Sequence, residues 1–307
     1  AVDYLEQADN LRREYGDDPE RPVNLKNLGE VLIDLGDYQH ARLKLETSRE
    51  ISQRLGLTVA QSHAEFGLCR LAVVEGNLPL ARAHLQRVRE LIDSLDEVND
   101  RVAHYYQLQA QIEMQENNLQ QAKASAERAL AIAQHGSMAT KQVDALRVLG
   151  ALNARTGRFE QAESYLTNSI QLAQQQNDRY SEAKTRYELG LMFQRWSENE
   201  PAQQMQYLEQ ADLALEAAAQ VFQALGARHD LKLAKNAQAL LPSPLKADRI
   251  SGKETEIENQ MNSVRARLHL PEGEWYLATI FSAVLQPRQG MDDELIFETT
   301  AFLIPPL

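Results

Sequence analysis

Few residues of this chain have the types and spacing that a chemical step requires. Seven histidines are scattered over 307 residues, and none forms a metal motif with a second histidine and a glutamate at helical spacing. Cys69 is the only cysteine, which excludes an internal disulfide and a thiolate zinc site. The chain has no glycine-rich phosphate loop and no serine elbow. We therefore predict no catalytic residue, no metal site and no cofactor.

The charge balance restricts the partners that the chain can attract. It has 32 basic and 44 acidic residues, a net charge of −12, which opposes non-specific binding to nucleic acid or to an anionic membrane. No apolar run approaches the roughly eighteen residues that cross a bilayer, and the N-terminal residues lack the organisation of a signal peptide. We expect a cytoplasmic protein whose partners are proteins or peptides.

A repeat of about 40 residues extends over the first 241 residues. Its clearest marker is an alanine that recurs every 40 or 41 positions, at Ala41, Ala81, Ala122 and Ala162. A small residue precedes each alanine by twelve positions, at Gly29, Cys69, Ala110 and Gly150. Small residues at both positions allow two helices to approach closely, so each copy is predicted to be a pair of packed helices and Cys69 to be a buried packing residue.

The turn inside each copy has its own sequence signals. Gly36 and Gly76 can adopt the left-handed conformation that ends a helix. The next helix is expected to begin with a side-chain cap at Asp37, Asn77 and Asn118. Arg158 departs from this pattern, so the fourth turn is expected to be looser than the others.

These residues resemble the tetratricopeptide repeat, in the longer variant of about 40 residues found in large bacterial regulators and kinesin light chains. The resemblance covers 1–241 and implies an all-α fold, an α-α superhelix of about five repeats plus a half repeat at the N-terminus. The fifth copy, with its pivot at Ala211, carries about nine extra residues within 196–206. Two interpretations stay open for this insertion: longer helices with a looser hairpin, or a protruding contact element.

Both ends of the array have distinctive patterns. Leu5, Ala8 and Leu11 match the second helix of a repeat whose first helix is missing, so the chain is expected to be a piece of a longer protein with domains upstream and downstream. At the other end, one more amphipathic helix is predicted to cap the last full repeat. Its apolar face consists of Leu231, Ala234, Ala237 and Leu240.

Composition changes after residue 241, where Pro242 and Pro244 indicate a boundary. We predict a linker and helix over 242–272 and a strand and helix over 273–307. The last segment resembles the opening of a class III nucleotide cyclase domain, but Ala283 stands where that family has a metal-binding aspartate. The resemblance thus implies a degenerate domain without cyclase activity. The alternative is a strand and helix that pack on the last repeat and have no cyclase ancestry.

In a superhelix of this family the first helix of each repeat lines the concave groove. Counting from the small residues, the groove is predicted to contain Lys26, His63, Phe66, Arg70, His104, Gln107, Arg147, Arg155, Tyr187 and Arg195. Arginine forks suit carboxylates and aromatic rings supply contact area, which favours an acidic or C-terminal peptide as ligand. The alternative is that the arginines pair with neighbouring carboxylates such as Glu30 or Asp144. Glu30 also replaces the asparagine of chaperone-binding relatives, so recognition of chaperone tails is not expected.

Two functions are compatible with this sequence. The first is a non-enzymatic scaffold or sensor module of a larger bacterial signalling protein, which binds a protein or peptide in its groove. The second is a sensor for a small-molecule inducer, as in resembling segments of ATPase-type regulators. Ligand size separates them, because a peptide engages several repeats whereas an inducer needs a closed pocket.

Overall fold

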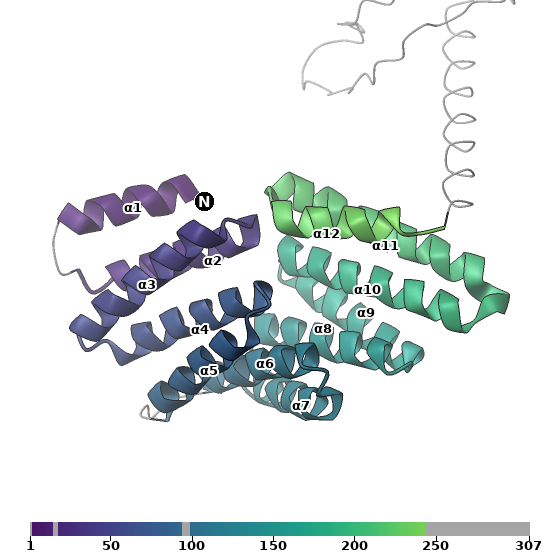
Figure 1. Cartoon of the computed structure of the whole chain (residues 1–307), viewed down its shortest axis with the longest axis horizontal. Helices are drawn as coiled ribbons and strands as arrows, with labels where there is room; N and C mark the ends of the chain where they lie inside the picture. Colours follow the sequence, from purple (N-terminus) through teal and green to yellow (C-terminus); the bar gives the residue numbers. More distant parts are fainter. Residues whose placement is uncertain (1, 15–17, 94–98, 243–307) are drawn as a thin grey trace, which may run out of the picture. The chain divides into compact units, whose positions relative to one another are not determined.

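The computed structural model describes residues 2–14, 18–93 and 99–242, and these form twelve α-helices and one short 3₁₀ helix, with no strand among them. The helices follow one another along the chain as hairpins (Figure 1). Their bounds are α1 Val2–Glu14, α2 Arg21–Leu35, α3 Tyr38–Arg54, α4 Thr58–Val74, α5 Leu78–Ile92, α6 Asn99–Gln115, α7 Leu119–His135, α8 Ala139–Arg155, α9 Phe159–Gln175, α10 Arg179–Asn199, η1 Pro201–Gln203, α11 Gln204–Leu225 and α12 Arg228–Ala239.

The described residues all belong to one compact unit, Ala1–Leu245. Within it the all-α repeat architecture is confirmed. The linker and helix predicted over 242–272 lie outside the described residues except for Pro242, and so does the cyclase-like strand and helix over 273–307. None of the described helices is long and apolar enough to cross a membrane.

Small residues hold the two helices of each hairpin close together. A Cβ atom on Gly29 would lie 2.6 Å from Leu45 Cγ, and one on Gly150 would lie 2.5 Å from Leu166 Cγ, which is closer than real Cβ contacts. Cys69 is fully buried, and its thiol lies 3.4 Å from the Ala81 carbonyl oxygen. The pivot alanines at 41, 81, 122, 162 and 211 are all 0% exposed. The twelve-residue spacing therefore predicted the helix crossing correctly.

The turns within the first four hairpins, at Gly36, Gly76, Asn117 and Gly157, share a residue with positive φ. Gly36 has φ 82° and Gly157 has φ 74°, and in each case the next amide N–H donates to a carbonyl five residues earlier, with Asp37 N to Leu32 O and Arg158 N to Asn153 O both 2.9 Å. This is the Schellman closure of a helix C-terminus. The expectation of a looser fourth turn at Arg158 is wrong, because the backbone closure forms without a side-chain cap.

The capping predictions are confirmed at two positions and wrong at the third. The side chain of Asp37 accepts a hydrogen bond from the His40 amide, and that of Asn77 accepts one from the Leu80 amide. Asn118 occupies the cap position but makes no such bond, and its Nδ2 donates to Glu116 Oε2 at 3.2 Å instead. The nearby carboxylate therefore competes with the helix N-terminus for this side chain.

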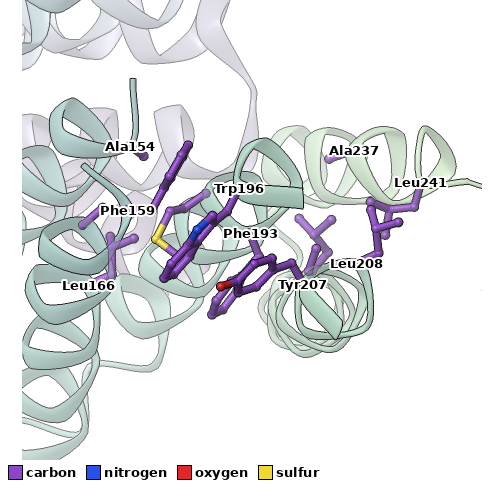
Figure 2. Close-up of a cluster of buried hydrophobic side chains, with 13 residues drawn as sticks. Ala154, Phe159, Leu166, Phe193, Trp196, Tyr207, Leu208, Ala237 and Leu241 are labelled. Atoms are coloured by element: carbon purple, nitrogen blue, oxygen red, sulfur yellow. The ribbon is translucent and has the colours of Figure 1, made fainter. Parts of the chain in front are cut away.

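The fifth hairpin resolves the insertion as longer helices. α10 has 21 residues and α11 has 22, joined through η1. Trp196, 6% exposed, stacks between Tyr207 and Phe159 with ring centroids 4.4 and 5.5 Å away, and Phe193 lies alongside (Figure 2). We call Phe159, Phe193, Trp196 and Tyr207 the aromatic cluster. The extra residues thus lengthen both helices. Trp196 packs against Phe159 of α9, whereas 198–199 and 201–206 are exposed.

The two terminal helices are joined to the array in different ways. In α1, the Leu5 carbonyl accepts a hydrogen bond from Asn24 Nδ2 at 2.8 Å, and Asp9 pairs with Arg21 at 2.8 Å. In α12, Ala234 and Ala237 are buried as predicted, whereas Leu240 lies just beyond the helix and is 75% exposed. Leu241 takes the buried place instead, near the aromatic cluster (Figure 2).

The even-numbered helices form an inner layer. Each of α2, α4, α6, α8 and α10 contacts the next even-numbered helix, and α12 contacts α2. In the described part of the chain no comparable contact joins one odd-numbered helix to the next. Successive inner helices are therefore closer than successive outer ones, so the array curves with its even-numbered helices on the concave side. The contact from α12 back to α2 closes the inner layer into a cycle of six helices.

Candidate functional site

Charged and polar side chains from all six inner helices gather on the inner side of this cycle. We call the following residues the inner cluster: Lys26, Glu30 and Asp34 of α2, Arg70 of α4, His104 of α6, Lys141, Asp144 and Arg147 of α8, Tyr180, Lys184 and Glu188 of α10, and Asp230 of α12. Asp34 and Arg70 influence the pKa of Lys184 from across the cycle. Side chains of helices far apart in the sequence thus converge.

Two inner helices, α2 and α4, carry charges that are paired with one another. Lys26 Nζ lies 3.1 Å from Glu30 Oε2, and Arg70 forms an ion pair with Asp34. Burial acts to lower the pKa of the Arg70 guanidinium, but the Asp34 carboxylate outweighs it and raises that pKa. On this side of the cluster each cation has its own carboxylate.

The α12 end of the cycle is linked to α10 and to α2. The Tyr180 hydroxyl donates a hydrogen bond to Asp230 Oδ2 at 2.7 Å, and the Tyr38 and His229 rings meet edge to face with centroids 5.6 Å apart. A Cβ on Gly36 would lie 3.1 Å from His229 Cβ, so the end of α2 and the start of α12 are in close contact. Burial, together with the carboxylates of Asp34 and Asp230, raises the pKa of Tyr180, which keeps this hydroxyl protonated as a donor.

On α8 one carboxylate is shared by several cations. Arg147 is 8% exposed and its Nη2 lies 2.9 Å from Asp144 Oδ1, while its Nε is buried and has no hydrogen-bond partner among the described residues. Burial acts to raise the pKa of Asp144, but Arg147, Lys184 and Lys141 together outweigh burial and lower this pKa to about 2. Asp144 is therefore a carboxylate held ionised by three surrounding cations.

The two lysines of this group have no carboxylate of their own. Neither Lys141 nor Lys184 has a carboxylate within 4.0 Å among the residues that the structure describes. Lys184 Nζ lies over the Tyr180 ring, 5.3 Å from its centroid. Burial, with Arg147 and Arg70, lowers the pKa of Lys184 to about 8, and burial lowers that of Lys141. Both ammonium groups are only partly compensated for their loss of water.

Four of the ten residues predicted to line the groove belong to the inner cluster: Lys26, Arg70, His104 and Arg147. The alternative in which arginines pair with neighbouring carboxylates holds for Arg147 with Asp144, and Arg70 pairs with Asp34 rather than with Glu30. His104 stacks on Phe66 with ring centroids 4.3 Å apart, and burial lowers its pKa well below the usual range. Burial therefore keeps the His104 imidazole neutral.

The other predicted groove residues have varied surroundings. Phe66 is 1% exposed and packs in the core with Leu85 and Leu108, so it offers little surface to a ligand. Gln107 is buried and its Oε1 has no partner among the described residues. Arg155 is exposed and donates to the Met114 carbonyl oxygen at 2.8 Å. The half-buried members are His63, Tyr187 and Arg195.

Sequence reasoning missed Lys141, Lys184, Glu188 and the Tyr180–Asp230 pair. Lys141 lies one helical turn before Asp144, and Lys184 lies one turn before Tyr187, so extending the inward-facing positions by a turn would have found both lysines. Burial raises the pKa of Glu188, which lies near Arg147 and Arg195. Asp230 had no such signal, because its position depends on how α12 meets α2.

The chain matches no family model and no curated protein, but solved structures share its fold. A Rap protein complexed with competence and sporulation factor matches with a TM-score of 0.56 and 18% identity, over 80% of this chain and 70% of that one. The apo form of RapI matches with a TM-score of 0.55 and 14% identity, over 82% and 92%.

A third similar structure is a signal transduction ATPase with numerous domains from Pyrococcus horikoshii, which has a tetratricopeptide repeat sensor. It matches with a TM-score of 0.51 and 16% identity, over 79% of this chain but only 36% of that one. These likenesses agree with the array of helical hairpins described above. The chain has the fold of a tetratricopeptide-repeat solenoid.

Proposed function

We propose that this tetratricopeptide-repeat solenoid is a non-enzymatic, cytoplasmic scaffold or sensor module of a larger bacterial signalling protein, and that it binds a protein segment or short peptide on its inner surface. The observation that carries the proposal is the inner cluster, where charged and polar side chains of six helices converge, most of them half-buried, and where Lys141 and Lys184 have no carboxylate within 4.0 Å among the described residues. A fold neighbour crystallised with a bound factor supports it.

The closed inner layer favours a short, extended ligand. Because α12 contacts α2, the six inner helices surround the inner cluster, and a narrow chain reaches it more easily than a folded partner domain does. A peptide presents charges and backbone hydrogen bonds on a narrow chain, and it can engage several inner helices at once. Exposed rim residues such as Arg155 would then contribute less than buried ones such as Arg147.

Selection from a library of random octapeptides tests this function. We expect the full chain to select binding peptides, and Arg147→Gln to weaken their binding by about tenfold because it removes the buried fork of the inner cluster. Arg158→Gln is the matched control, since Arg158 is an exposed arginine in an outer turn. Circular dichroism checks that both variants fold. Selected peptides that bind both variants equally well, or the absence of any selected peptide, would contradict the proposal.

A small-molecule inducer is the second candidate ligand. The observation that favours it is the convergence of side chains across the cycle, with Asp34 and Arg70 close enough to shift the pKa of Lys184. Thermal denaturation with a panel of charged metabolites tests this candidate, because a ligand that binds only the folded state raises the melting temperature. A metabolite that stabilises the parent chain but not Arg147→Gln, together with a failed peptide selection, would favour the inducer.

A further inference from the structure

The contact between the first and the last inner helix joins the two ends of the array. A Cβ on Gly36, at the end of α2, would lie 3.1 Å from His229 Cβ on α12, and a Cβ on Gly226 would lie 3.7 Å from Leu35 Cδ2. The rings of Tyr38 and His229 meet edge to face with centroids 5.6 Å apart. We call these five residues the clasp.

The clasp can open while the hairpins stay packed. Apart from it, the principal helix contacts in the described part of the chain join helices that are adjacent or next but one along the array. In a solenoid the contacts between neighbours supply the stability, and the shape is the sum of small rotations from one repeat to the next. Small changes in these rotations therefore separate the two ends, and the separation breaks only the contacts of the clasp.

The closed clasp leaves one polar group unsatisfied. The hydroxyl oxygen of Tyr38 is buried and has no hydrogen-bond partner among the described residues. Burial, with the carboxylates of Asp230 and Glu75, raises the pKa of Tyr38 to about 12, so the hydroxyl keeps its proton. A buried donor without an acceptor costs free energy, and exposure to water on opening recovers that cost. The closed form is therefore less stable than its ring contact and apolar contacts alone would make it.

Tyr180 links the clasp to the inner cluster. Its hydroxyl donates to Asp230 Oδ2 at 2.7 Å, and this bond holds the first turn of α12, where His229 also lies. Lys184 Nζ of the inner cluster lies over the same ring, 5.3 Å from its centroid. Arg70, on the other side of the clasp, is close enough to influence the pKa of Tyr180. A ligand that contacts Lys184 or Arg70 therefore alters the surroundings of the residue that positions α12.

We propose that the clasp opens and closes reversibly to admit and retain the ligand of the inner cluster, and that Tyr180 is a positioning residue that favours the closed form. The statement about the ligand rests on the proposed peptide-binding function, whereas the opening itself does not. A peptide that contacts inner helices on both sides of the clasp binds the closed form better than the open form. Its binding therefore shifts the array towards the closed form.

Distances between spin labels on the full chain test the clasp. The labels are attached to cysteines that replace Gln39 of α3 and Lys235 of α12, both of which are exposed, while the native Cys69 is fully buried. We expect a shorter distance from the closed form and a longer one from the open form. His229→Ala removes the ring contact and should raise the ratio of open to closed form about fivefold. Tyr180→Phe keeps the ring but loses the bond to Asp230, and it should raise the ratio about threefold.

Two controls and one ligand complete the experiment. His135→Ala on α7 and Tyr4→Phe on α1 change exposed side chains and should keep the parent ratio. A selected octapeptide should lower the ratio of open to closed form in the parent, and it should dissociate about fivefold faster from His229→Ala.

The outcomes separate this inference from the proposed function. A single distance that neither substitution changes would overturn the clasp and leave peptide binding intact. A ratio in Tyr180→Phe equal to that of the parent would overturn the role of Tyr180, and equal peptide dissociation from the parent and His229→Ala would overturn retention of the ligand. Two distances that respond to His229→Ala, without any selected peptide, would support the clasp and overturn the peptide as its ligand.

Discussion

The aromatic cluster is buried and most of the inner cluster is half-buried, and the two are built in opposite ways. In the aromatic cluster, Trp196 stacks on two rings and its indole N–H donates to Glu200 Oε1 at 3.0 Å, so both its apolar surface and its polar atom are satisfied. In the inner cluster, as far as the described residues go, Lys184 has no carboxylate within 4.0 Å and Arg147 Nε has no hydrogen-bond partner. The first arrangement stabilises the fold.

This difference is one reason for our proposal that the inner surface binds the ligand. A buried charge that is only partly compensated lowers stability, and such groups are common at binding sites. The two helices of each hairpin pack through apolar and small residues, whereas the inner surface carries charges that a ligand could neutralise. Substitutions in the two regions should therefore have opposite effects on the free energy of unfolding.

The largest expected effect is on the aromatic cluster. Trp196→Ala removes a ring that is 6% exposed and packed between α9 and α11, so we expect a loss of about 3 to 5 kcal/mol in the free energy of unfolding. Denaturant titration followed by circular dichroism measures it. Leu213→Ala on α11 is the control, because Leu213 is 65% exposed and should change little. A similar cost for both variants would show that Trp196 is not a packing centre.

A smaller loss is expected where the hairpin helices cross. Gly150→Ala places a Cβ 2.5 Å from Leu166 Cγ, and overpacking of this kind costs about 1 to 3 kcal/mol. In the double variant with Leu166→Ala the new Cβ has room, so the two changes should cost less together than the sum of their separate effects. Thermal denaturation of the four proteins measures this coupling, and additive losses would contradict the crossing geometry.

Lys184→Met should increase the free energy of unfolding, whereas the two preceding variants lower it. Burial and neighbouring cations lower the pKa of Lys184 from 10.5 to about 8, so its charged form is disfavoured in the folded protein and its removal should stabilise the chain by about 1 kcal/mol at neutral pH. In the parent, stability should rise between pH 8 and 10.5, where the unfolded chain binds more protons, and Lys184→Met should lack this rise. Denaturant titration across this range checks both statements, with Lys235→Met as control.

The smallest expected effect is a shift in the acid unfolding midpoint of Asp144→Asn. Its pKa is lowered from 3.8 to about 2, so the stability that its ionised form contributes is complete above pH 3.8 and is lost as the pH falls towards 2. Asp144→Asn removes this contribution, and we expect its acid unfolding midpoint to differ from that of the parent by about 0.3 pH unit, because many other carboxylates titrate in the same range. Identical acid unfolding midpoints for the parent and Asp144→Asn would show that the surrounding cations do not act on Asp144.

The sequence was sufficient to predict the hairpins but not the pairing of charges within the inner layer. The spacing of Gly150 and Ala162 predicted a helix crossing because close approach needs small residues at both positions. The turn at Arg158 was mispredicted because the Schellman closure is a property of the backbone and needs no particular side chain at the cap.

Other features depend on tertiary contacts that no local pattern encodes. Asp230 reaches Tyr180 only because α12 contacts α2 and α10, and the pairing of Arg70 with Asp34 depends on the packing of α4 against α2. Lys141 and Lys184 were within reach of the inward-facing pattern, one helical turn from predicted positions. The pattern could not predict that neither lysine has a carboxylate nearby, since this depends on which side chains converge across the cycle.

Hydrogen exchange of the full chain with a selected acidic octapeptide tests the central claim most directly. Binding at the inner cluster should slow exchange in the inner helices α8 (Ala139–Arg155) and α10 (Arg179–Asn199) and leave their outer partners α9 and α11 nearly unchanged. Protection confined to α9 and α11, or spread equally over inner and outer helices, would contradict the account that the charged inner surface is the binding site.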